Sequence, residues 1–283
     1  MLLALDIGNT NTVLGLYSPA GDTPSELIAH WRITTPIGQT ADEFGIQIRN
    51  LFALRDLAPS VVDGIVISSV VPPIDSTLRQ VCESFFHIKP LFIEPGVKTG
   101  LPVLTDNPAE VGADRIVNCV AAFDRFGGPC VVVDMGTATT FDVISAKGEF
   151  LGGAIAPGLG ISADALFSHA ARLPRVEIRR PAKVIGTGTI DNIQIGLYYG
   201  YIGLVDGILE RLIAELGPGT KTVATGGLAK LIAGGSKYIT TVDEFLTLTG
   251  LRIIFERNAD RHRKRAAADA ARPAAPAPEP QTV

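Results

Sequence analysis

Apolar and polar residues follow one another in the same order in two segments of the chain. Residues 3–12 (Leu-Ala-Leu-Asp-Ile-Gly-Asn-Thr-Asn-Thr) are matched by residues 131–140 (Val-Val-Val-Asp-Met-Gly-Thr-Ala-Thr-Thr). In each segment an apolar run predicts a buried strand, and the glycine with its polar neighbours predicts a tight turn. The repetition predicts two related halves, each built around a strand and a turn.

The chemistry of these turns indicates a phosphate site. Successive backbone N–H groups of such a turn form a cradle for an anion. Because an aspartate cannot bind an anion directly, we expect Asp6 and Asp134 to hold a cation or a water that neutralises phosphate charge. Two such units facing each other predict a nucleotide between the halves. The alternative is structural, since turns rich in Asp, Asn and Gly also connect ordinary hairpins.

Other patterns predict the elements around these turns. Residues 2–17 predict a hairpin with the first cradle at its tip. Thr40 and Glu43 have the spacing of a capping box, which predicts a helix through about Leu54. A further helix is predicted to begin at Asn107, with Pro108 in its first turn and residues 112–115 on its first turns.

The most apolar stretch, residues 193–209, predicts a buried helix capped by residues 187–189. Its glycines recur on one helix face, where we expect another backbone to approach closely: Gly196, Gly200, Gly203 and Gly207. The stretch contains Gln194 and Asp206 and falls short of the ~20 uncharged residues of a membrane-spanning helix.

Length, composition and net charge indicate how many domains the chain forms and which partners are excluded. The 283 residues suffice for two domains, which we place at 1–124 and 125–258. Residues 259–283, rich in Ala and Pro, are predicted to be a disordered tail. A net charge of −4 argues against a nucleic-acid-binding face, and the start of the chain lacks the pattern of a secretory signal, so a cytoplasmic protein without a membrane partner is expected.

The cysteines and histidines are too irregularly spaced to predict a disulfide framework or a metal clip. The three cysteines are expected to be small core residues: Cys82, Cys119 and Cys130.

Asp114 is the best candidate for acid–base chemistry in the first half. Asp114 and Arg115 stand together near a predicted helix start among apolar residues, where charge is costly unless a ligand or partner uses it. The alternative is that the pair caps the helix or meets partners at a domain interface. A later turn at residues 225–227, Thr-Gly-Gly, is placed to lie against a nucleotide.

Several motifs in this order make the chain resemble the type III pantothenate kinases, members of the acetate and sugar kinase/Hsp70/actin superfamily. The resemblance extends from Met1 to about Asn258. Its motifs are Asp-Ile-Gly-Asn-Thr at 6–10, Val-Gly-Ala-Asp-Arg at 111–115, Asp-Met-Gly-Thr-Ala-Thr-Thr-Phe-Asp at 134–142, the glycine-rich passage 153–158 and Thr-Gly-Gly at 225–227.

This resemblance implies an α/β fold of two RNase H-like (actin-like ATPase) domains with a nucleotide cleft between them, assembled as a homodimer. It implies transfer of the γ-phosphoryl group of ATP to the 4′-hydroxyl of pantothenate, the first step of coenzyme A synthesis. It also implies two cations as cofactors, Mg²⁺ and a monovalent ion, either K⁺ or NH₄⁺.

Residue roles follow from the matching motifs. The resemblance assigns ATP binding to Asp6, Ile7, Gly8, Asn9, Thr10, Asn11, Thr12, Val13 and Thr137. It assigns pantothenate binding to Gly112, Ala113, Asp114, Arg115 and Thr189, with Asp114 as the proton acceptor, and the monovalent cation to Asp134. From the chemistry of guanidinium groups, we add that Arg115 steers the pantothenate carboxylate.

Two positions depart from the family pattern. Many relatives carry Tyr where Thr105 stands, at a position that contacts pantothenate, and many carry Asn where Gly188 stands. Both departures are expected to affect the affinity for the acceptor more than the kinase reaction.

Two other functions are compatible with the pattern. One is a kinase of the same superfamily that phosphorylates another small hydroxyl compound. The other is a regulatory protein or accessory transcription factor of the same fold, against which the intact Asp114 and both cradles argue, because a pure binding protein needs no general base.

Overall fold

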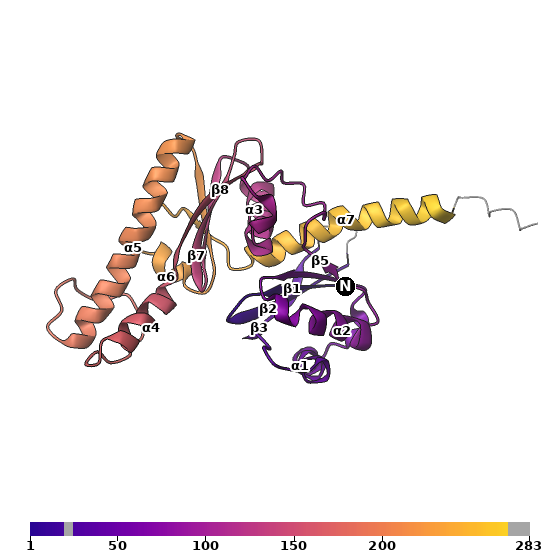
Figure 1. The fold of residues 1–283 in the computed structure, drawn as a ribbon, viewed down its shortest axis with the longest axis horizontal. Coiled ribbons are helices and arrows are strands. Elements are labelled where there is room, and N and C mark those ends of the chain that lie inside the picture. Colours follow the sequence, from indigo (N-terminus) through magenta and orange to yellow (C-terminus); the bar gives the residue numbers. More distant parts are fainter. Residues whose placement is uncertain (20–24, 271–283) are drawn as a thin grey trace, which may run out of the picture.

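The computed structural model describes residues 1–19 and 25–270 and contains two five-stranded sheets (Figure 1). The first has the order β3-β2-β1-β4-β5, and the second has the order β10-β9-β6-β7-β8. The strands of the first are β1 (Leu2–Ile7), β2 (Asn11–Tyr17), β3 (Leu27–Thr34), β4 (Gly64–Ser69) and β5 (Leu91–Phe92). Those of the second are β6 (Cys130–Met135), β7 (Ala138–Ile144), β8 (Phe150–Pro157), β9 (Lys221–Thr225) and β10 (Thr241–Val242).

The two sheets share one topology. In each, three strands form an antiparallel meander, and two later strands add in parallel beside the first. Asp6 pairs with Val13 in the first sheet, and Asp134 pairs with Thr140 at the matching place in the second. The predicted hairpin over residues 2–17, the two related halves and the α/β fold class are therefore confirmed.

The helices form three layers around these sheets. They are α1 (Ala41–Ala53), α2 (Asp75–Phe85), α3 (Ala113–Phe126), α4 (Leu159–His169), α5 (Thr189–Leu216), α6 (Ala229–Ala233) and α7 (Leu246–Ala270), with 3₁₀ turns at Pro59–Val61, Pro72–Ile74 and Pro108–Glu110. Helices α1 and α2 cover the outer face of the first sheet, and α5 and α6 cover the outer face of the second. Between the sheets, α3 and α7 share one core with apolar residues of both halves.

The ends of the first helix agree with the sequence, and those of the third do not. Thr40 and Glu43 form the predicted capping box at the start of α1. The helix predicted from Asn107 is wrong: Asn107 caps only the 3₁₀ turn, and α3 begins separately at Ala113. The backbone is extended at the intervening Gly112, which interrupts the helical hydrogen bonds and places Asp114 in the first turn of a new helix.

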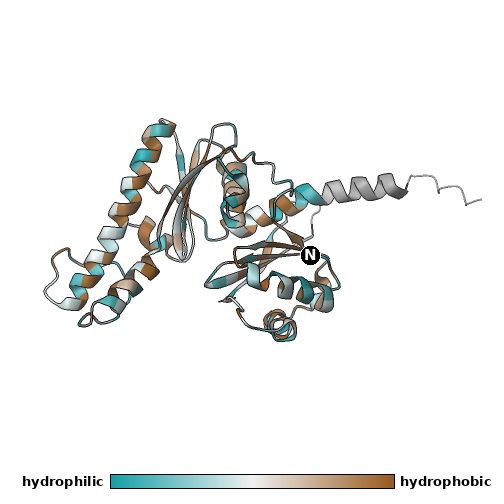
Figure 2. Ribbon diagram, in the orientation of Figure 1, coloured by the Kyte–Doolittle hydropathy of each residue, from teal (hydrophilic) through white to brown (hydrophobic). Residues whose placement is uncertain are grey.

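Helix α5 is buried on one face only. Figure 2 shows hydrophobic residues recurring along its length, and its inner face packs on the second sheet. The predicted close approach at its glycines does not occur among the described residues, since a Cβ atom added at Gly196, Gly200 or Gly203 would meet none of their atoms within 4 Å. The helix begins within the predicted capping segment 187–189: Gly188 is the N-cap residue, and no side chain makes a capping hydrogen bond.

The end of the chain departs in part from expectation. Helix α7 extends to Ala270 and so includes residues 259–270, which the composition assigned to a disordered tail. Alanine, arginine and lysine have high helix propensities, which accounts for the continuation. Residues 271–283, the rest of that predicted tail, lie outside the described residues. Of the helices in the described part of the chain, none combines the length and hydropathy needed to span a membrane.

The three cysteines, at positions 82, 119 and 130, are buried free thiols, as predicted.

Helices α3 and α7 cross at very close range, which gives a prediction about stability. A Cβ atom added at Gly250 in α7 would lie 2.1 Å from the carbonyl oxygen of Val117 in α3. We expect Gly250→Ala to lower the free energy of unfolding by roughly 1–3 kcal/mol, the usual cost of overpacking a core. Gly160→Ala in α4 is the matched control, because a Cβ atom there meets nothing within 4 Å. Chemical denaturation measures both, and equal stability of the two variants would contradict the prediction.

Candidate active site

A cavity lies where the carboxyl ends of β1 and β6 meet the starts of α3 and α7. It has an empty volume of about 980 Å³, including its opening to solvent. Both halves contribute to its wall, which contains Asp6, Gly8, Asn9, Thr10, Asn11, Val13, Arg32, Val70, Asp114, Asp134, Gly136, Thr137, Ala138, Thr140, Thr225, Gly226, Gly227, Glu244, Thr247 and Leu248. The structure therefore brings together both predicted cradles, the late Thr-Gly-Gly turn and the candidate base.

The two cradle turns face and touch each other. The hydroxyl groups of Thr10 and Thr137 lie 3.0 Å apart across the cavity. Each turn is closed by its own glycine N–H, which donates to the carbonyl of Asn11 in one half and of Ala138 in the other, at 3.0 Å in both cases. The internal repeat thus produces two equivalent polar turns on opposite walls of one cavity.

Three carboxylates point into this region from different elements. Asp6 and Asp134 are the next-to-last residues of β1 and β6, and Asp114 lies in the first turn of α3. Burial raises the pKa of Asp6 well above its usual value, and the negative charges of Asp114 and Asp134 raise it further. Burial and the charge of Asp114 raise the pKa of Asp134 to about 7. Carboxylates gathered in this way require positive charge from outside their own group to remain ionised.

Asp134 is held in place by two polar side chains that the sequence analysis did not identify. The Asn118 amide donates to the Asp134 carboxylate at 2.9 Å, and the Thr247 hydroxyl donates to the Asn118 carbonyl oxygen at 2.7 Å. Asn118 is fully buried in α3. Asn118 stands in a run of otherwise apolar residues at 116–122, which is the signal that could have identified it, because a buried amide needs partners.

The conformation of Asp114 is set by its neighbours. One carboxylate oxygen accepts a hydrogen bond from the backbone N–H of Arg115 at 2.8 Å. A Cβ atom added at Gly112 would lie 2.6 Å from that same oxygen, so only glycine leaves it room. Burial raises the pKa of Asp114, while the hydrogen bond and the Arg115 charge partly oppose that rise.

Arg115 pairs with a buried carboxylate. Its Nε and one terminal nitrogen both lie 2.6 Å from an oxygen of Asp142, which is fully buried in β7. The second Asp142 oxygen accepts from the Thr140 hydroxyl at 2.9 Å. Only the remaining edge of the guanidinium group is therefore left for the pantothenate carboxylate that we expected it to steer.

Thr105 lies beside this ion pair. The backbone N–H of Leu104 donates to the carbonyl of Phe150 at 2.8 Å, and the Arg115 guanidinium lies over the Phe150 ring. The Thr105 hydroxyl is buried without a hydrogen-bond partner in the described structure. Thr105 is thus next in the chain to a residue hydrogen-bonded to Phe150, the residue whose ring Arg115 covers.

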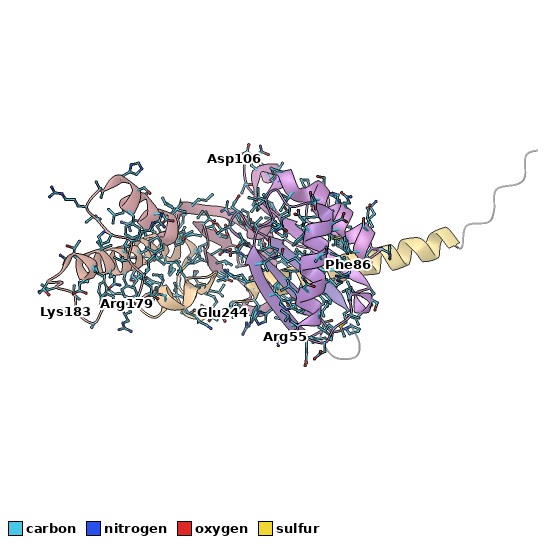
Figure 3. The ribbon with its side chains drawn as sticks, turned by 90° about the horizontal axis from the view of Figure 1, so that it is seen from below. Arg55, Phe86, Asp106, Arg179, Lys183 and Glu244 are labelled. Atoms are coloured by element: carbon cyan, nitrogen blue, oxygen red, sulfur yellow. The ribbon has the colours of Figure 1, made fainter. Side chains whose placement is uncertain are left out.

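Some of the predicted site residues do not line the cavity. Ile7 packs into the core of the first half, and the buried Thr12 hydroxyl contacts that of Thr35 at 3.3 Å. Gly112, Ala113 and Arg115 flank Asp114 outside the cavity wall. Thr189 is exposed at the start of α5. In Figure 3, Lys183 of the segment leading to α5 lies far from Glu244, which lines the cavity.

The donor set fits a cation that is bound jointly with a phosphate. Within the described residues, no three His, Cys, Asp or Glu side chains come close enough to form a metal site by themselves. Mg²⁺ in phosphoryl-transfer sites needs only one or two carboxylates beside the phosphates of the substrate. The desolvated Asp6 and Asp134 are suited to that arrangement, since a cation would offset the cost of burying their charge.

Two halves of one RNase H-like topology, with a polar turn of each facing a shared cavity, define the class of the actin-like ATPases and sugar kinases. A family model described as type III pantothenate kinase matches residues 2–211. The chain is 64% identical over 270 residues to the type III pantothenate kinase of Koribacter versatilis, covering 94% of this chain and 98% of the relative. It is 65% identical over 257 residues to that of Acidobacterium capsulatum, covering 90% and 94%. The chain belongs to the type III pantothenate kinase family.

A solved structure supports the fold independently. A Campylobacter jejuni protein assigned to the Baf family of transcriptional activators superposes with a TM-score of 0.57, covering 91% of this chain and 99% of that one. At 21% identity, this likeness shows the fold alone.

Proposed function

We propose that this protein transfers the γ-phosphoryl group of ATP to the 4′-hydroxyl of pantothenate, the first step of coenzyme A synthesis. The reaction is that of the family to which the chain belongs. Two relatives named type III pantothenate kinase are 64% and 65% identical to it, and the alignments cover nearly their whole length. The observation that carries the proposal for this chain is the position of Asp114 at the wall of a cavity that both cradle turns share.

The cradles serve the nucleotide. Phosphoryl transfer needs mainly positioning and neutralisation of charge. The turns at residues 8–11 and 136–138 offer hydroxyls to the ATP phosphates, together with backbone N–H groups other than those of Gly8 and Gly136, which close the turns. A bound Mg²⁺ would supply charge neutralisation on the phosphates beside Asp6, and K⁺ or NH₄⁺ would do so beside Asp134. Asn118 and Thr247 keep the Asp134 carboxylate aimed at that place.

Asp114 serves the acceptor. A primary alcohol is a poor nucleophile, so a carboxylate within hydrogen-bond reach accelerates its attack by taking the proton as the new O–P bond forms. The proton passes from the 4′-hydroxyl oxygen to Asp114, the γ-phosphorus bonds to that oxygen, and ADP leaves. The N–H of Arg115 and the absence of a side chain at Gly112 hold one carboxylate oxygen and leave the other for the substrate.

A homodimer accounts for the position of Thr189. Within one chain Thr189 does not line the cavity, so its predicted contact with pantothenate requires a second copy. The open glycine face of α5 and exposed apolar residues on the same half support such an interface: Leu151, Ile155, Ile190 and Tyr199. Thr105, with its unpartnered hydroxyl, is proposed to contact the acceptor. A cytoplasmic location stays a prediction of the sequence.

The direct test is ADP release from purified protein with ATP and Mg²⁺, with and without pantothenate, in sodium and then in potassium buffer. We expect release that depends on pantothenate and is stimulated by potassium, and sedimentation at twice the 29.8 kDa of one chain. Release with another alcohol from a panel, but not with pantothenate, would instead indicate a different acceptor. No release with any acceptor would favour a regulatory protein.

A further inference from the structure

One row of residues crosses the first sheet at the level of the cavity. In the strand register, Ser68 of β4 lies opposite Asp6 of β1, Asp6 opposite Val13 of β2, and Val13 opposite Arg32 of β3. Residues directly opposite one another in neighbouring strands point to the same face of a sheet. Arg32 therefore points to the face that carries Asp6, and its side chain reaches the cavity wall.

The second half has no such cation. The equivalent row contains Thr225 of β9, Asp134 of β6, Thr140 of β7 and Ile155 of β8. Ile155 thus occupies the place of Arg32 and is 65% exposed. Since the two sheets otherwise match strand for strand, the arginine is a feature of the first half alone.

Arg32 reaches toward the turn of the opposite half. A Cβ atom added at Gly227 would lie 3.4 Å from a terminal nitrogen of Arg32. Gly227 belongs to the Thr-Gly-Gly turn after β9, so the guanidinium bridges the mouth of the cavity from one half toward the other. Its positive charge lowers the pKa values of both Asp6 and Asp134, although burial outweighs this effect.

The guanidinium group is not neutralised by an ion pair. No carboxylate in the described part of the chain lies within salt-bridge distance of Arg32, even though three aspartates and Glu244 share its cavity. Glu244, the remaining acidic residue of the wall, pairs with Lys230 at 2.8 Å. An exposed, planar guanidinium that forms no ion pair, placed beside the cradle turns, is suited to bind two oxygens of a multiply charged oxyanion such as a phosphate.

We infer that Arg32 binds the polyphosphate of ATP and couples the two halves of the cleft around it. This inference rests on the proposed kinase function and adds to it a side-chain contact outside both repeated turns. Across the first sheet the order of this row is Ser68, Asp6, Val13 and Arg32. The nucleotide phosphates would therefore lie between Arg32 and the carboxylates that hold the cation.

The test compares Arg32→Met with the wild-type enzyme by titration with ADP and with adenosine, in the presence of Mg²⁺. We expect the ratio of ADP affinity to adenosine affinity to fall about 10- to 100-fold, the range of one or two charge-assisted hydrogen bonds. Arg32→Lys should recover part of the loss, since it retains the charge without the planar fork. Turnover should show a raised KM for ATP with little change in the KM for pantothenate.

Arg55→Met is the matched control, because Arg55 is exposed just after α1 and does not line the cavity. An unchanged ratio in Arg32→Met would overturn the inference. So would an equal loss of ADP and adenosine binding, which would indicate a damaged cleft. If the wild-type enzyme bound ADP and adenosine equally, both the kinase function and the role of Arg32 would be overturned. If the wild type phosphorylates pantothenate but Arg32→Met keeps its ADP preference, only the role of Arg32 is wrong.

Discussion

Asp114→Asn should remove nearly all turnover of pantothenate while ATP binding and the fold remain intact. The asparagine keeps the shape of the side chain and still accepts the hydrogen bond from the N–H of Arg115, but it cannot take the proton of the hydroxyl. General-base catalysis contributes roughly 10²–10⁴-fold, so a fall in kcat of that order is expected. Pre-steady-state and steady-state assays measure kcat, and titration with ATP measures binding.

The pH dependence supplies a second readout for the same residue. A general base acts only when it is deprotonated, so activity is lost as pH falls through its pKa. Burial raises the pKa of Asp114, which places the acid limb of the wild-type profile above the usual carboxyl range. The acid limb should change in any residual activity of Asp114→Asn, because only the protonation of Asp6 and Asp134 then remains to produce it.

Asp42→Asn is a suitable control, because Asp42 is exposed in the first turn of α1 and does not line the cavity. A near-wild-type rate for Asp114→Asn would show that positioning alone suffices and that Asp114 is not the base. Loss of ATP binding together with turnover would point instead to a damaged cleft.

Most of the fold could be predicted from the internal repeat and from the residues that mark the starts of helices. Two copies of one strand-and-turn pattern predicted two halves and placed both cradles, because buried strands and glycine turns are determined locally by sequence. The capping box at Thr40 and Glu43 fixed the start of α1 for the same reason. The start of α3 was predicted too early, because Asn107 caps only a short 3₁₀ turn. The backbone at Gly112 is not helical and separates that turn from α3.

Parts of the site could not be predicted, because they depend on register and on contacts between distant segments. Arg32 reaches the cavity only because β3 pairs with β2 in one register. Thr247 and Asn118 meet across 129 positions of sequence, and Arg115 meets Asp142 across 27. The glycine face of α5 is open because no other described segment packs on it. The helical spacing of the glycines does not show whether a segment of the same chain covers them.

Asp134→Ala should leave activity weak and insensitive to potassium. The Asp134 carboxylate is the acceptor to which Asn118 donates, and it stands among the negative charges of Asp6 and Asp114. A monovalent cation held there would offset those charges while the phosphoryl group is transferred. Removal of one preorganised electrostatic group of this kind typically lowers kcat by about 10²–10³-fold. The measurement is turnover as potassium replaces sodium at constant ionic strength.

Asp164→Ala is the matched control, since Asp164 forms only an exposed ion pair with Arg175. Thermal unfolding in sodium and in potassium separates cation binding from catalysis: potassium should raise the midpoint of the wild type and of Asp164→Ala, but not that of Asp134→Ala, because a ligand stabilises only the state that binds it. If Asp134→Ala lost activity yet kept both the potassium shift and the potassium stimulation, the cation would have to bind elsewhere. The hydrogen bond from Asn118 would then only compensate for the burial of the Asp134 carboxylate and would have no part in binding a cation.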